Sequence, residues 1–270
     1  MTPSAAREVL EALAKRVPGS AGRVRLSFED GLAWLRLDNP EAHNAVTVRM
    51  MCDLAEAVER LSSWKGQAVV LCSSTPGMFC AGSHLAEVQS ALSPGAAGRD
   101  MALAMGALLD QLLTQPALVV GAVEGTAVGG GAEIVTACDF RVLHRDARVH
   151  FVHARLGVAP GWGGTGRLVA HLGRAGALRA LTAATPMTAE EALGAGFADA
   201  VVDGPAIDGA LKLLEPLRAL PAAATRAVKA QVVAANDPKA QAERFCEVWG
   251  GPDHRAALEA MWAKRRSRIQ

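Results

Sequence analysis

The chain has 270 residues, with 28 basic and 27 acidic side chains, a net charge of +1 and a hydrophobic content of 50%. This length and balance allow a large buried core and exclude a disordered or fibrous protein. Tyrosine is absent, which excludes any mechanism that needs a tyrosyl hydroxyl as acid, nucleophile or anion clamp. The nearly neutral chain also lacks the basic patch of a nucleic-acid-binding protein.

Apolar residues recur at helical and strand spacings in alternation along the chain. In chain order we predict a helix at 1–17, strands at 23–28 and 32–37, a helix at 48–61, a strand at 68–72, a loop at 73–83, a helix at 99–114, a strand at 117–123, a helical stretch ending at 137, and strands at 140–143 and 149–152. Asp30-Gly31 is typical of a hairpin turn, and Thr47 or Asn44 is expected to cap the second helix.

This alternation predicts an α/β layer structure with mostly parallel strands. From about residue 188 the pattern is helical almost to the end. We therefore divide the chain near residue 200, with a core at 1–200 and a helical C-terminal region at 201–270.

The cysteines and the N-terminus indicate a cytoplasmic protein. The odd number of cysteines and the absence of a CxxC pair favour reduced core thiols; they are Cys52, Cys72, Cys80, Cys138 and Cys246. The first 17 residues carry acidic side chains and do not form a secretory signal. No apolar run is long enough to span a membrane.

Residues 161–166 match the GxGxxG pattern of a dinucleotide phosphate loop. The context argues against that interpretation, because the segment follows Ala159-Pro160 and not a hydrophobic strand. Residues 185–188 also offer no acidic side chain for a ribose hydroxyl.

A second cluster, Gly129-Gly130-Gly131-Ala132-Glu133, follows an apolar strand and opens a helix. Unpaired N–H groups at such a point stabilise an oxyanion, although tight helix packing would also explain the glycines. Phe79-Cys80-Ala81-Gly82-Ser83 is another turn of small residues after a predicted strand. We expect it to present a second N–H group toward the same point.

These segments resemble the crotonase (enoyl-CoA hydratase/isomerase) superfamily. Further matching segments cover nearly the whole chain: 39–45, 125–133 with 138–139, 156–168 and 187–196. The resemblance implies a spiral of ββα repeats, a helical C-terminal region that completes the site, and a homotrimer or a dimer of trimers. It also implies an acyl-CoA substrate, with no metal and no cofactor beyond the CoA moiety.

By the same resemblance, Ala81 and Gly130 would donate the N–H groups that hold the thioester oxygen as it becomes an enolate. Gly129 would line the substrate site, and Trp162 would face the leaving group. The residues implied to lie near the CoA moiety are Ser83, His84 and Leu85 at its adenine end, and Lys229 and Lys264 near its phosphates.

Glu133 matches one of the two carboxylates that hydratases of the family use, whereas the position of the second is occupied by His153. Syn addition of water needs two groups that share one water molecule, so the imidazole puts plain hydratase activity in doubt. Either group could protonate an enolate, and His153 could instead bind a carboxylate. If the substrate itself carries a carboxylate, that group and an ionised Glu133 would repel each other. Glu133 is therefore expected to hold a proton or to hydrogen-bond the substrate carboxylate.

Together with residues 136–141 and 248–252, the segments described above resemble decarboxylases of this superfamily. This resemblance implies loss of CO2 from a short branched malonyl thioester, ethylmalonyl-CoA or methylmalonyl-CoA. The lack of tyrosine favours the ethylmalonyl type, since methylmalonyl-type sites are thought to use one. Two alternatives remain, an enoyl-CoA hydratase or isomerase that uses Glu133 as its base, and a catalytically silent acyl-CoA-binding paralogue.

Overall fold

The computed structural model describes residues 1–17, 19–91 and 96–267. The strands are β1 (Arg23–Glu29), β2 (Leu32–Asp38), β3 (Ala68–Ser73), β4 (Met78–Cys80), β5 (Leu118–Val123), β6 (Thr126–Val128), β7 (Phe140–His144), β8 (Arg148–His150), β9 (Met187–Thr188) and β10 (Ala200–Val202). The helices are α1 (Pro3–Ala14), α2 (Val48–Ser63), α3 (Leu85–Ala91), α4 (Ala96–Thr114), α5 (Gly130–Val135), α6 (Gly164–Ala183), α7 (Ala189–Gly194), α8 (Ala206–Arg218), α9 (Ala222–Val233), α10 (Pro238–Val248) and α11 (Pro252–Ser267), with 3₁₀ helices η1 (Pro40–Ala42) and η2 (Val152–Leu156). No helix in these ranges is long and apolar enough to cross a membrane.

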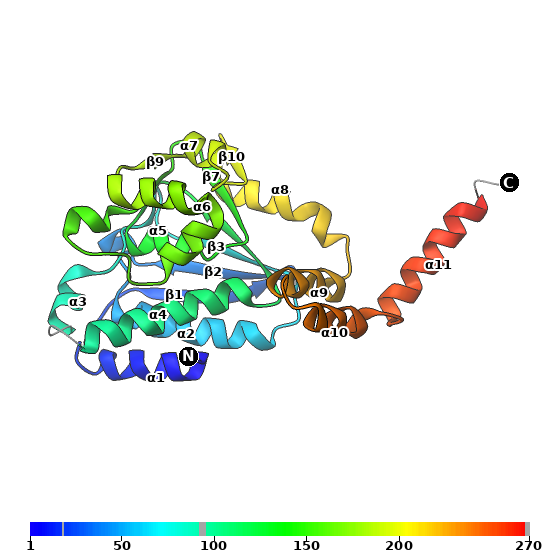
Figure 1. The fold of residues 1–270 in the computed structure, drawn as a ribbon, viewed down its shortest axis with the longest axis horizontal. Helices are drawn as coiled ribbons and strands as arrows, with labels where there is room; N and C mark the ends of the chain where they lie inside the picture. The colour runs from blue at the N-terminus through cyan, green and yellow to red at the C-terminus, as the bar shows by residue number, and fades with distance from the viewer. Residues whose placement is uncertain (18, 92–95, 268–270) are drawn as a thin grey trace.

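The strands form two sheets, with the orders β1-β2-β3-β5-β7-β10 and β4-β6-β8-β9. Neighbours in the larger sheet are parallel, except for β1 and β2. In each of the successive pairs β3–β4, β5–β6 and β7–β8, the first strand joins the larger sheet and the second joins the smaller one, and helices follow. This is the predicted α/β spiral of ββα repeats (Figure 1).

The N-terminal predictions are confirmed. β1 and β2 pair across Asp30 and Gly31, whose φ angles of 51° and 76° are those of a two-residue hairpin turn. Thr47 caps α2, since its Oγ1 accepts a hydrogen bond from the Met50 N–H at 3.2 Å. Helix α1 buries its apolar face against α2 and α4, as its amphipathic pattern predicts.

The very short strands differ from the sequence predictions. β4 lies inside the predicted loop at 73–83, and β8 ends at His150, because η2 begins at Val152. β10 lies in the part predicted to be helical and pairs with β7, so the larger sheet continues across the proposed boundary at residue 200. Strands of two or three residues are too short to show an alternating pattern, and their place is decided by pairing with distant strands.

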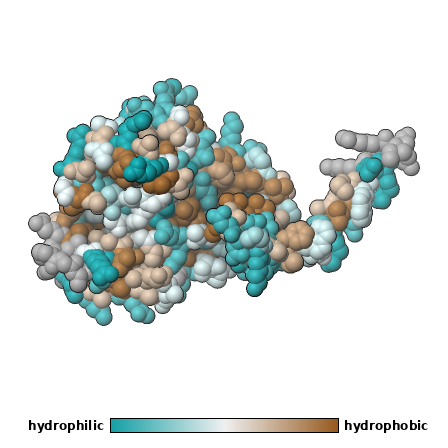
Figure 2. Space-filling view, in the orientation of Figure 1, coloured by the Kyte–Doolittle hydropathy of each residue, from teal (hydrophilic) through white to brown (hydrophobic). Residues whose placement is uncertain are grey.

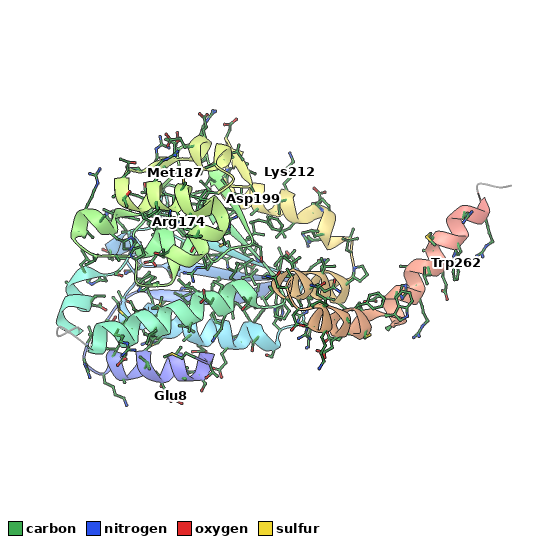
Figure 3. The ribbon with its side chains drawn as sticks, in the orientation of Figure 1. Glu8, Arg174, Met187, Asp199, Lys212 and Trp262 are labelled. Atoms are coloured by element: carbon green, nitrogen blue, oxygen red, sulfur yellow. The ribbon has the colours of Figure 1, made fainter. Side chains whose placement is uncertain are left out.

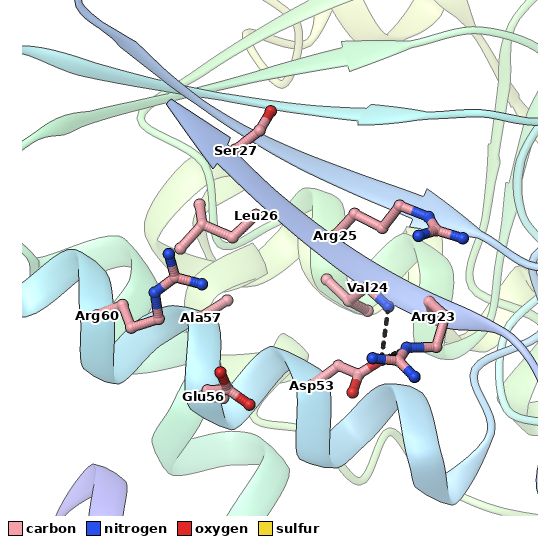
Figure 4. Close-up of a pocket in the computed structure, with 9 residues that line it drawn as sticks. All are labelled: Arg23, Val24, Arg25, Leu26, Ser27, Asp53, Glu56, Ala57 and Arg60. Carbon is pink, nitrogen blue, oxygen red and sulfur yellow. Dashed lines mark hydrogen bonds and ion pairs between the residues drawn. The ribbon is translucent and has the colours of Figure 1, made fainter. Parts of the chain in front are cut away.

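A surface cavity of about 380 Å³ lies between the edge strand β1 and helix α2 (Figure 4). Within it, the Asp53 carboxylate accepts a hydrogen bond from the Val24 N–H at 3.1 Å and pairs with Arg23 at 3.0 Å. None of the described residues that line this cavity was predicted to belong to the functional site. This ion pair fastens the start of β1 to α2.

A buried ion pair joins α9 to the sheet. Lys229 Nζ donates hydrogen bonds to Asp139 Oδ2 at 2.6 Å and to the Ala117 carbonyl at 2.8 Å. The same Asp139 oxygen accepts the Val119 N–H at 2.7 Å. Burial raises the pKa of the Asp139 carboxyl and lowers the pKa of the Lys229 ammonium, because each charge is held out of water.

We expect Lys229→Met to lower the free energy of unfolding by about 3–5 kcal/mol, because it leaves the Asp139 carboxylate buried without its cation. Adding Asp139→Asn should recover a large part of that loss, since no buried charge then remains. Urea unfolding of both variants measures these values, with the exposed Lys212→Met as the matched control. Equal effects of Lys229→Met and Lys212→Met would contradict the structural role of the pair.

Candidate functional site

The structure brings the two glycine loops into contact. Gly82 has a φ of +96°, and a Cβ atom there would lie 2.8 Å from the Val128 carbonyl oxygen and 3.3 Å from the Gly130 nitrogen. Only glycine permits both this backbone conformation and this approach. The segment after β4 therefore packs directly against the segment that opens α5.

Some N–H groups of these loops are bonded to the protein and others have no partner in the described ranges. The Ala81 N–H donates to the His43 carbonyl at 3.1 Å, and the Gly129 N–H donates to the His150 carbonyl at 2.8 Å. Ala81 is therefore not a free donor, which corrects the prediction made for it. Within the described ranges, the N–H groups of Ser83 and Gly130 show no hydrogen-bond partner.

Strand geometry explains why the Ser83 N–H has no hydrogen-bond partner in the described part of the chain. Ser83 forms an isolated parallel bridge with Val46, in which the Gly82 carbonyl and the His84 N–H are bonded to Val46 at 2.7 and 2.9 Å. Because successive residues of an extended segment face opposite sides, the Ser83 N–H is turned away from Val46.

Asn44 holds this loop in place, a role that the sequence analysis missed. Its side-chain NH2 donates to the Phe79 carbonyl at 3.1 Å and to Ser73 Oγ at 2.6 Å, while its Oδ1 accepts the Asn39 N–H at 2.7 Å. Its φ of +56° is one that asparagine tolerates better than most residues. The sequence signal for this role was the segment at 39–45, which matches the crotonase superfamily.

Glu133 is buried, and both of its carboxylate oxygens contact the protein. Oε1 accepts hydrogen bonds from the N–H groups of Trp162 at 2.8 Å and of Gly164 at 3.0 Å. Oε2 lies 3.1 Å from His153 Nε2. Both oxygens therefore already have partners within the protein. The loop at 161–166 binds an anion, but that anion is a side chain of the same protein.

His153 reaches Glu133 from η2 and is itself 8% exposed. Its Nε2 faces Glu133, whereas its Nδ1 is buried and has no hydrogen-bond partner in the described part of the chain. A Cβ atom on Gly129, whose φ is +52°, would lie 3.9 Å from Nε2, so the imidazole lies beside the turn that precedes Gly130. A buried ring nitrogen without a hydrogen-bond partner is uncommon in folded proteins.

Trp162 closes the other side of Gly130. A Cβ atom on Gly130 would lie 2.5–3.0 Å from three carbon atoms of the indole, so the ring occupies the space where a side chain would begin. Arg167 fixes the same loop, because its guanidinium donates to the Trp162 carbonyl and to Thr136 Oγ1 and pairs with Asp110.

Comparison with known proteins assigns the chain to a family. Residues 27–248 match the family described as enoyl-CoA hydratase/isomerase. The chain belongs to the enoyl-CoA hydratase/isomerase family. An ethylmalonyl-CoA decarboxylase from Danio rerio is 36% identical over 259 residues, which cover 92% of this chain and 84% of that protein. The Homo sapiens ethylmalonyl-CoA decarboxylase is 33% identical over 261 residues, covering 93% and 83%.

The fold of the enoyl-CoA hydratase/isomerase family is also seen in a crystal structure of a putative enoyl-CoA hydratase from Streptomyces coelicolor A3(2). It superimposes with a TM-score of 0.81 at 28% identity, covering 90% of this chain and 92% of that one.

The residues that the family resemblance implied to lie near CoA belong to different elements of the structure. His84 and Leu85 follow Ser83 at the start of α3, where Leu85 is exposed and His84 Nδ1 accepts the Glu87 N–H at 3.4 Å. Lys229 is paired with Asp139, which does not support the phosphate contact predicted for it. Lys264 belongs to α11, but its side chain lies outside the described part of the structure.

Gly164→Ala should displace Glu133, because the new Cβ would lie 2.6 Å from the Glu133 Cγ. We expect it to lower the free energy of unfolding by about 1–3 kcal/mol, as overpacking does. Gly166→Ala is the matched control, since a Cβ there meets nothing within 4 Å and alanine in a helix adds up to about 1 kcal/mol of stability. Thermal and urea unfolding of the two variants measure this difference, and equal stabilities would contradict the close packing.

Proposed function

We propose that this protein decarboxylates a short branched malonyl-CoA thioester, ethylmalonyl-CoA in preference to methylmalonyl-CoA. The names of its relatives support the reaction. The observation that carries the proposal is the Glu133–His153 pair, at 3.1 Å, beside the unpartnered N–H groups of Ser83 and Gly130.

The first step breaks the bond between the 2-carbon of the substrate and its carboxylate. The electron pair of that bond moves into the thioester carbonyl, CO2 leaves, and the product is an enolate. In our proposal the N–H groups of Ser83 and Gly130 bind the enolate oxygen, and losing one such donor typically costs about 3–4 kcal/mol. The thioester itself accepts the electrons, so the step needs no cofactor beyond the CoA moiety.

His153 is proposed to act between the carboxylate of Glu133 and the carboxylate of the substrate. Its Nε2–H donates to Glu133, and its Nδ1, which is buried without a partner, binds the substrate carboxylate as part of an imidazolium. After CO2 leaves, Nδ1 gives its proton to the 2-carbon of the enolate, and the ring regains a proton from solvent. The apolar indole of Trp162 favours departure as uncharged CO2.

The same pair argues against hydration as the main reaction. A hydratase needs two groups that share one water molecule, but here both oxygens of Glu133 contact the protein and its neighbour is an imidazole. Because the chain has no tyrosine, we assign the contacts with the substrate's polar atoms to His153 and to backbone N–H groups.

The decisive assay follows CO2 and product mass from ethylmalonyl-CoA and methylmalonyl-CoA. We expect turnover, with kcat/KM reduced about 10²- to 10⁴-fold in His153→Ala. Glu133→Gln combined with His153→Ala should be no worse than His153→Ala alone, because groups that act as a unit are not additive. His144→Ala, which changes a histidine outside the site, should retain wild-type rates.

Other results of this assay would overturn the proposal. Loss of crotonyl-CoA absorbance at a rate abolished by Glu133→Gln, without CO2 release, would identify a hydratase. Tight CoA binding without turnover of any thioester would identify a silent binding protein.

We also propose a homotrimer or a dimer of trimers. Helix α11 extends away from the body, and its Trp262 is about half exposed (Figures 1 and 3). A hydrophobic surface also lies between α8 and α9 (Figure 2), where a groove of about 560 Å³ includes the exposed Leu220, Val228 and Val232. Apolar surface of this kind supports association with further copies.

Light scattering should therefore give three or six times the chain mass of 28.0 kDa. Val232→Ser should shift the protein toward smaller species, because it places a hydroxyl in the apolar contact. A monomer at micromolar concentration would contradict the proposed assembly.

A further inference from the structure

We infer that Trp162 limits the length of the acyl group that this enzyme accepts. The inference rests on the proposed function for the place of the acyl group, whose thioester oxygen is bound at Ser83 and Gly130. The 2-carbon and its alkyl substituent then lie within a few bond lengths of the Gly130 N–H.

The indole packs directly against Gly130. An imagined Gly130 Cβ would lie 2.5 Å from Cζ3 and 2.7 Å from Cη2 of Trp162. The ring is therefore in van der Waals contact with the Cα atom of the residue whose N–H binds the oxyanion. An alkyl chain growing from the 2-carbon along this wall meets the indole.

The ring is also held in place. The Trp162 N–H donates to Glu133 and its carbonyl accepts from Arg167, so the backbone is fixed on both sides. The residue is only 2% exposed, so neighbouring atoms cover the ring and restrict its movement. A fixed wall excludes a longer chain, whereas a mobile one would yield to it.

Small residues lie behind the loop. A Cβ on Gly106 of α4 would lie 3.7 Å from the Trp162 carbonyl carbon, and a Cβ on Gly161 would lie 3.8 Å from the Ala102 Cβ. Replacing Trp162 with a shorter apolar side chain removes most of the indole volume and leaves a cavity beside Gly130. That space would accept additional methylene groups.

The test compares dissociation constants of butyryl-CoA, hexanoyl-CoA and octanoyl-CoA by calorimetry, which requires no turnover. We expect the wild type to bind butyryl-CoA most tightly and Trp162→Leu to bind hexanoyl-CoA or octanoyl-CoA at least tenfold more tightly relative to butyryl-CoA, since one methylene in a matched apolar pocket is worth about 10- to 200-fold. Trp162→Phe should shift the order in the same direction by less. Trp64→Leu removes a tryptophan that packs on Phe28 outside the site, and should keep the wild-type order.

Each outcome decides the inference. A wild type that binds all three thioesters equally would overturn it, and so would a Trp162→Leu protein that keeps the wild-type ratios. If Trp162→Leu does not fold, unchanged ratios in Trp162→Phe overturn it instead. Absence of CO2 release with a shifted chain-length order would reject the decarboxylation and leave the size limit standing.

Discussion

The geometry of the site depends on one buried carboxylate, that of Glu133. An isolated charge in this position would cost several kcal/mol, and three groups compensate for it: two N–H groups of the loop before α6 and the imidazole of His153. Each contact also fixes a second feature. The Trp162 N–H holds the indole against Gly130, and the Gly164 N–H sets the beginning of α6. The hydrogen bond to His153 directs its other nitrogen away from Glu133.

The glycines of the site follow from close packing around these contacts. Gly82 lets one loop approach the backbone before Gly130, Gly130 leaves room for the indole, and Gly164 leaves room for the side chain of Glu133. The GxGxxG letters at 161–166 thus have a physical cause that resembles that of a phosphate loop, because N–H groups at a helix N-terminus bind an anion in both. In this protein the anion comes from α5.

Long periodic elements could be predicted from the sequence, because α2 and the β1–β2 hairpin carry their own spacing and turn signals. The short strands β4 and β10 could not, because pairing with distant strands decides their place. In the site, the residue types suggested an oxyanion hole, but they could not show which N–H is free. That depends on the pairing of Ser83 with Val46 and on the bond from Ala81 to His43. The burial of Lys229 was equally hidden, because its partner Asp139 lies on a separate segment.

If His153 lies between Glu133 and the substrate carboxylate, as we propose, the order of events in the reaction follows. In the proposed complex, the ring contacts Glu133 through Nε2 and the substrate carboxylate through Nδ1 before decarboxylation. When CO2 leaves, one of those anions disappears and the negative charge moves to the enolate. The proton on Nδ1 is then held less firmly and faces the carbon that has just gained electron density. In this proposal protonation therefore follows carbon–carbon cleavage, and the contact with the buried carboxylate of Glu133 keeps the ring oriented.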